Sequence, residues 1–116
     1  MDSNYNYALC GKYELSILKG FNAIKLRGAY KGTKLYKAYC TGFKTFVEYV
    51  KLNGILIAEY KPIDNTNTSL YNQIYYIING IVCSIQVLNN EVESVGLSID
   101  IPYHIFSMAN ELFILK

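Results

Sequence analysis

Residues 73–101 read QIYYIINGIVCSIQVLNNEVESVGLSIDI, and this stretch decides the fold class. Asn79-Gly80 between two apolar runs predicts a β-hairpin, because a type I′ turn needs positive φ at both central positions. A two-residue loop then sets three apolar pairs on one face of the hairpin: Ile78 with Ile81, Tyr76 with Cys83, and Ile74 with Ile85. The register is self-consistent, since cross-strand apolar pairs stabilise a sheet.

The next segment predicts a third strand in the same sheet. Its apolar residues alternate with small or polar ones, as in a strand with one buried face; they are Val95, Leu97, Ile99 and Ile101. This face matches the hairpin face only if the connecting loop has an odd length, and a three-residue loop at 89–91 meets that condition. Residues 73–101 therefore predict a three-stranded antiparallel meander.

Two further strand regions lie before the meander. Residues 13–18 alternate, and Gly20-Phe21 suits a type II′ turn, so we expect a hairpin over residues 12–28 with Glu14 opposite Arg27. Residues 54–60 read as a strand that Pro62 ends. With the meander, these segments predict an antiparallel sheet of five to six strands.

Two helices complete the expected fold. Apolar residues at helical spacing predict a central helix over about 41–52, with Thr33 as an alternative start, and Asn53-Gly54 is a good stop. A C-terminal helix is expected over 102–115, after Pro102. We expect both helices to pack on one face of the sheet, which gives one α+β domain spanning residues 1–116.

Composition excludes several classes of protein. The chain has 116 residues, 52% of them hydrophobic and 17% charged, which is the reverse of a disordered segment. The longest apolar runs are far too short for a membrane helix, and we expect neither a secretory signal nor a membrane partner. Three widely spaced cysteines without a CxxC pair favour a reducing, cytoplasmic location and no metal or other cofactor.

Catalytic motifs are absent from the sequence, which leaves an enzyme as an alternative only. His104 is the single histidine, and with Cys10, Cys40 or Cys83 it could form a nucleophile and base pair. Glu91 and Glu93 are the most closely spaced carboxylates. A solvated loop edge and inert core thiols explain the same residues without catalysis.

Charge is the most informative functional feature. Residues 1–62 carry a net charge of +6 and residues 63–116 a net charge of −4. In one unbroken helix from Thr33, lysines at every seventh position would form a stripe along one side. The candidate residues for binding nucleic acid or another anionic partner are Lys34, Lys37, Lys44, Lys51, Tyr30 and Tyr36. A solvated helix face is the alternative interpretation.

The leading hypothesis is a small non-enzymatic protein that binds another protein or a second copy of itself. Twelve tyrosines and the pair Tyr49 and Leu52, on the helix side away from the expected core, favour such an interface. Plentiful Ile, Asn, Lys and Tyr are typical of an AT-rich genome. We therefore hypothesise a viral or phage accessory or inhibitor factor that acts on a host complex, with nucleic-acid binding as the alternative.

Overall fold

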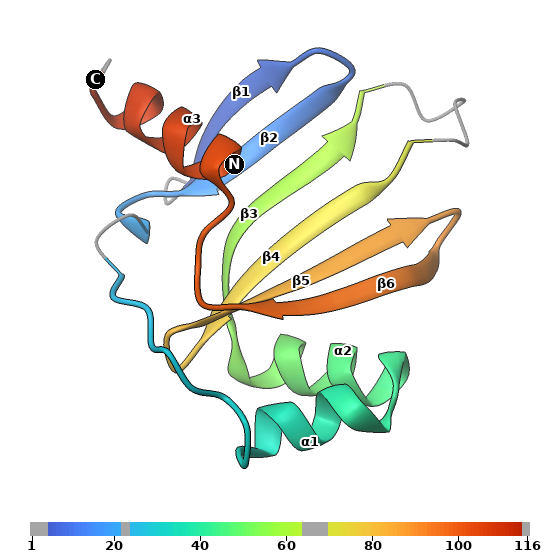
Figure 1. Ribbon diagram of the computed structural model, residues 1–116. Coiled ribbons are helices and arrows are strands. Elements are labelled where there is room, and N and C mark those ends of the chain that lie inside the picture. Colours follow the sequence, from blue (N-terminus) through green and yellow to red (C-terminus); the bar gives the residue numbers. More distant parts are fainter. Residues whose placement is uncertain (1–4, 22–23, 64–69, 115–116) are drawn as a thin grey trace.

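The computed structural model describes residues 5–21, 24–63 and 70–114, which form six strands and three helices (Figure 1). In chain order the elements are β1 (Tyr5–Cys10), β2 (Tyr13–Leu18), α1 (Lys34–Thr41), α2 (Phe43–Asn53), β3 (Ile55–Pro62), β4 (Asn72–Ile78), β5 (Ile81–Leu88), β6 (Glu91–Ser98) and α3 (Tyr103–Ile114). The strands form one sheet in the order β1 to β6, and every neighbouring pair is antiparallel. The predicted α+β class and antiparallel sheet are confirmed, and the six strands agree with the expected five to six.

The hairpin of β4 and β5 has the predicted turn and register. Asn79 and Gly80 have φ values of 50° and 81°, the two positive angles that a type I′ turn needs. Ile78 pairs with Ile81, Tyr76 with Cys83, and Ile74 with Ile85.

The turn between β5 and β6 differs from the predicted one, but the side chains of β6 still lie on the predicted face. The turn contains two residues, Asn89 and Asn90, rather than three, and both have positive φ. A β-bulge compensates, because Gln86 pairs with Ser94 whereas Val87 pairs with Val92, which leaves Glu93 as the extra residue. Ile85 therefore still pairs with Val95.

The hairpin predicted over residues 12–28 is wrong. β2 pairs with β1 on one side and β3 on the other, so Leu15 lies between Ala8 and Tyr60. After Gly20 the chain leaves the sheet, and the side chain of Phe21 is fully buried. Alternation in residues 13–18 predicted the strand but not its partner, because a pattern within one segment does not specify which other segment pairs with it.

The central helical region is two helices. Gly42 has a φ of 145°, a value that side chains disfavour, and it separates α1 from α2. Thr33 caps α1, with its hydroxyl oxygen accepting a hydrogen bond from the Tyr36 N–H at 3.2 Å. The alternative start at Thr33 is therefore the cap of α1, whereas the expected start near residue 41 falls at the end of α1, and α2 begins at Phe43. One unbroken helix from 33 to 53 does not exist.

The helices cover opposite faces of the sheet, which corrects the expected arrangement on one face (Figure 1). On the face that we name the α2 face, Phe46 and Val50 pack with Ile78 of β4 and with apolar residues of β5. On the opposite α3 face, Ile105 packs with Ile77 and residues of β2 and β3. Neighbouring strand residues point to opposite faces, so an apolar β4 requires a cover on each side. The side chains of residues 109–116 lie outside the described part of the structure.

The turn at Gly80 generates a stability prediction. A Cβ added there would lie 3.0 Å from the Arg27 nitrogen and 3.1 Å from the Lys25 oxygen, in a backbone with positive φ. We expect Gly80→Ala to lower the free energy of unfolding by about 3 kcal/mol. Gly11→Ala is the matched control, since Gly11 has a φ of 62° but no atom within 4 Å of the added Cβ. It should cost only about 1 kcal/mol. Equal losses in chemical denaturation would contradict the clash.

Candidate binding site at the basic helical end

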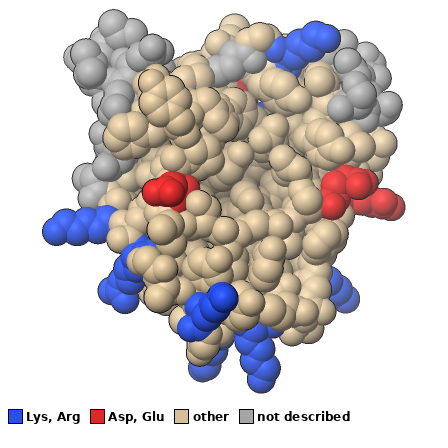
Figure 2. Space-filling model, in the orientation of Figure 1, with Lys and Arg blue, Asp and Glu red and all other residues tan. Residues whose placement is uncertain are grey.

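Positive charge gathers around α1, α2 and the segment that leads into them. Residues 24–53 contain seven basic residues and one acid, Glu48. All seven basic residues are exposed: Lys25, Arg27, Lys31, Lys34, Lys37, Lys44 and Lys51. Figure 2 shows basic side chains projecting at the lower end of the molecule, where Figure 1 places α1 and α2. We call this region, residues 24–53, the basic end.

The predicted lysine stripe is divided into two pairs. Lys34 and Lys37 belong to α1, whereas Lys44 and Lys51 belong to α2, and Gly42 separates the two helices. On α2, Glu48 follows Lys44 by four residues and precedes Lys51 by three, so its carboxylate lies between them on the same side of the helix. The positive field is therefore stronger over α1 than over α2.

A shallow depression of about 250 Å³ lies at the start of α1. Its lining brings Arg27 and Lys34 together with the rings of Tyr30 and Tyr49, and we call it the Arg27 pocket. The Arg27 N–H donates to the Gly80 carbonyl at 2.9 Å, which ties the segment before α1 to the β4–β5 turn. Three of the predicted residues thus meet at one place: Tyr30 precedes α1, Lys34 is the first residue of α1, and Tyr49 comes from α2.

Arg27 was not among the predicted binding residues. The expected hairpin placed it opposite Glu14, but in the sheet Glu14 pairs with Leu9 and Lys61. The density of basic residues from Lys25 to Lys37 was the available signal. This signal did not lead to Arg27, because the residues around it were interpreted as the second strand of the hairpin over residues 12–28.

Aromatic rings form a continuous series along α1. Ring centroids are 5.7 Å apart for Tyr30 and Tyr36, 6.3 Å for Tyr36 and Tyr39, and 5.5 Å for Tyr39 and Phe46. A hydrogen bond with the Cys40 thiol is the main reason that the pKa of Tyr36 is raised above 10.0. Tyr30 and Tyr36 are half-buried, so these predicted residues contribute ring edges beside the lysines rather than open stacking platforms.

The predicted protein-interface pair has a mixed outcome. Leu52 is 84% exposed at the end of α2, whereas Tyr49 is half-buried and lines the Arg27 pocket. Phe43 at the start of α2 and Ile55 after its end are also exposed. Exposed apolar side chains therefore flank the lysines of α2.

The expected Cys–His pair does not form with Cys83 or Cys40. Cys83 packs on the α2 face, Cys40 belongs to α1 on that same face, and His104 begins α3 on the opposite face. The His104 ring instead packs against Tyr60, with ring centroids 5.6 Å apart. The side chain of Cys10 lies outside the described part of the structure.

The carboxylates and other polar groups show no built catalytic cluster in the described residues. Glu91 and Glu93 are both exposed, and the bulge makes Glu93 the unpaired residue of β6. No group of three His, Cys, Asp or Glu within residues 5–21, 24–63 and 70–114 could hold a metal ion. In the same ranges, none of the three helices has the length and apolarity needed to cross a bilayer.

Comparison of the chain with protein-family models, curated proteins and solved structures gave no match.

The burial of Cys83 generates a reactivity prediction. Desolvation raises the pKa of its thiol from 9.0 to about 12, and a thiolate is the reactive form. We expect iodoacetamide to label Cys40, which is exposed, and to spare Cys83 until the protein is unfolded. Peptide mass spectrometry locates the label. Equal labelling of both cysteines in the folded protein would contradict the buried position of Cys83.

The same shift predicts a dependence of stability on pH. Because the folded pKa of Cys83 lies above its unfolded value, the protonated thiol contributes stability that is fully present below pH 9 and is lost as the pH rises toward 12. We expect Cys83→Ala to have a lower free energy of unfolding at neutral pH but a shallower decline in alkali. Denaturant titrations at several pH values measure both slopes. Parallel slopes for the two proteins would contradict the assignment.

Proposed function

We propose that this protein is a non-enzymatic interaction protein that docks its basic end on an acidic surface of another protein. The observation that carries the proposal is the concentration of seven basic residues against one acid over residues 24–53. Charges of one sign on one end of a small protein steer association with a partner of the opposite sign.

Apolar side chains at the same end support a protein partner in particular. Phe43, Leu52 and Ile55 are 45%, 84% and 54% exposed, and they flank the lysines of α2. Burial of apolar area contributes affinity in protein interfaces, whereas surrounding charges contribute specificity and association rate. An acidic protein surface with an apolar centre complements this arrangement.

Nucleic acid is the second candidate partner, and the Arg27 pocket is the observation that favours it. Two cationic side chains and the rings of Tyr30 and Tyr49 line one depression. Cations contact phosphates, and aromatic rings contact bases.

The protein-partner proposal predicts a loss of binding after charge reversal. Lys34→Glu/Lys37→Glu changes two exposed residues of α1, and we expect at least a tenfold weaker complex, mostly through slower association, because the reversed charges repel an acidic partner. Capture from nuclease-treated lysate, followed by binding kinetics with each captured protein, measures this.

Lys12→Glu/Lys19→Glu is the matched control, because it makes the same change in net charge at exposed residues outside the basic end. It should leave the captured proteins and their affinities unchanged. Capture of the same proteins by both double variants would overturn the proposal. Loss of the whole captured set after nuclease treatment would favour nucleic acid instead.

The nucleic-acid candidate has its own test with a fluorescent single-stranded oligonucleotide. Binding should weaken steeply with salt, with a slope of about −0.7 for each phosphate contacted. Arg27→Glu should weaken binding and make the slope shallower. Unchanged fluorescence anisotropy at about 50 mM salt, where phosphate contacts are strongest, would exclude this candidate.

A further inference from the structure

β1 is an edge of the sheet with no neighbour on its outer side among the described residues. The two edge strands differ in the features that prevent unwanted pairing. β6 carries Glu91 and Glu93, contains Gly96 and is bulged, whereas β1 reads YNYALC and has neither charge, proline nor glycine. Charges and bulges are what normally protect an edge, so β1 is the edge that is open to pairing.

The hairpin register shows which backbone groups point outward from β1. Cys10 and Tyr13 close the two-residue turn, so they form a hydrogen-bonded pair, and Ala8 and Leu15 form the next one. Tyr7 and Leu9 occupy the alternate positions. Their N–H and C=O groups therefore point away from β2, toward the open edge.

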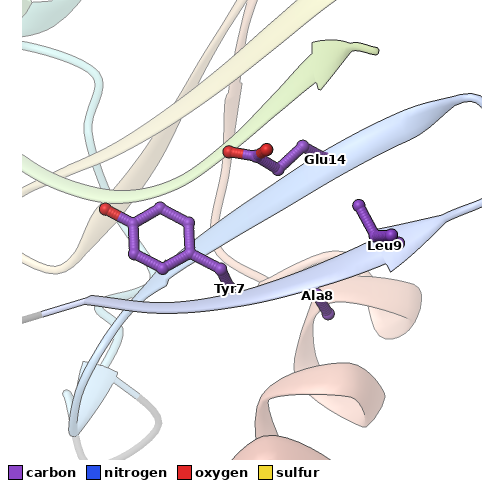
Figure 3. A pocket seen from close by; sticks show the side chains of 4 residues that line it. All are labelled: Tyr7, Ala8, Leu9 and Glu14. Carbon is purple, nitrogen blue, oxygen red and sulfur yellow. The ribbon is translucent and has the colours of Figure 1, made fainter.

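The side chains of Tyr7 and Leu9 add an apolar surface to this edge. They are 45% and 74% exposed and lie on the α2 face, where the core beneath α1 and α2 is formed by residues of β4, β5 and β6. Figure 3 shows Tyr7, Leu9 and Glu14 rising from one face of the hairpin, where they line an open depression of about 510 Å³. Ala8 points to the other face.

We propose that β1 pairs with β1 of a second copy of this chain, antiparallel and about a two-fold axis. The two sheets would then form one continuous sheet of twelve strands. A two-fold axis places each central side chain opposite its own copy, so a strand can pair with itself without repulsion only if it is uncharged there. β1 meets this condition along its whole length, whereas β6 carries two carboxylates in its first three residues.

The direction of the outward groups restricts the register. Hydrogen-bonded pairs must join odd-numbered residues of both copies, because Tyr7 and Leu9 carry the outward groups. A pairing centred on Tyr7 keeps residues 5–9 of each copy opposite one another, whereas a pairing centred on Ala8 would bring Tyr5 opposite Gly11 in the turn. The Tyr7-centred register also places each Leu9 opposite Tyr5 of the second copy.

The basic ends do not oppose this dimer. Helices α1 and α2 pack against β4, β5 and β6, so the basic end lies away from the β1 edge (Figure 1). Self-association therefore goes beyond the proposed function and uses a different surface, and either proposal can fail without the other.

Light scattering over a range of concentrations tests the dimer. We expect the wild-type chain to be dimeric and Leu9→Lys to shift the equilibrium to monomer by at least tenfold, because the lysine removes the apolar contact and an ammonium group at the paired edge must lose part of its hydration. Leu9 is 74% exposed, so the variant should keep its fold, which circular dichroism checks.

Leu52→Lys is the matched control, since Leu52 is 84% exposed on α2, and this variant should remain dimeric. A monomeric wild-type chain at all concentrations would overturn the proposal and leave β1 to a partner of another sequence. Dissociation by Leu52→Lys, with Leu9→Lys unaffected, would also overturn it and place the interface on α2.

Disulfide trapping tests the register, in a chain that also carries Cys10→Ser and Cys40→Ser. In a hydrogen-bonded antiparallel pair the two Cα atoms are about 5.5 Å apart, which suits a disulfide. Tyr7→Cys should therefore give a covalent dimer on oxidation. Leu9→Cys should not, because four residues along a strand separate the two copies by about 13 Å. Equal trapping at both positions would contradict the Tyr7-centred pairing.

Discussion

The hairpin of β4 and β5 carries apolar side chains on both of its faces, and the rest of the structure depends on this constraint. Ile78, Ile81 and Cys83 point to one face, whereas Ile77 and Val82 point to the other. Exposure of either face to water is unfavourable, since the burial of each aliphatic side chain contributes about 1.5–3 kcal/mol of stability. The chain therefore supplies two covers, with α1 and α2 on one side and α3 with the segment after β2 on the other.

The positions of these two covers also determine where the proposed binding surfaces lie. Each cover protects part of the sheet, so the α2 face stays open over β1, where Tyr7 and Leu9 are exposed. The helices that cover the other end turn their lysines outward, since lysine stems can lie along apolar surface while the ammonium groups stay in water. A basic surface and an uncharged strand edge thus occur at different places on one small molecule.

The sequence predicted the meander well because its register depends on neighbours in the chain. Asn79-Gly80 accepts positive φ at both positions, and alternation then assigns every side chain to a face. The loop after Leu88 has two residues and not the expected three, but the side chains of β6 still lie on the predicted face. The extra residue is Glu93, which forms a bulge opposite Gln86 and Val87. The partner of β2 was not predictable in this way, because alternation within residues 13–18 does not specify which other segment pairs with them.

The sequence by itself determined the antiparallel meander, the helix boundaries at Thr33 and Gly54, and the concentration of basic residues before residue 62. Local rules suffice for these features, since turn chemistry, capping and periodicity act within a few residues. Only the tertiary structure decided that the helices lie on opposite faces, that Arg27 joins Tyr30, Lys34 and Tyr49 around one pocket, and that β1 is an edge strand of the described sheet. These features depend on contacts between distant segments, and such contacts form wherever burial of the whole sheet is most complete.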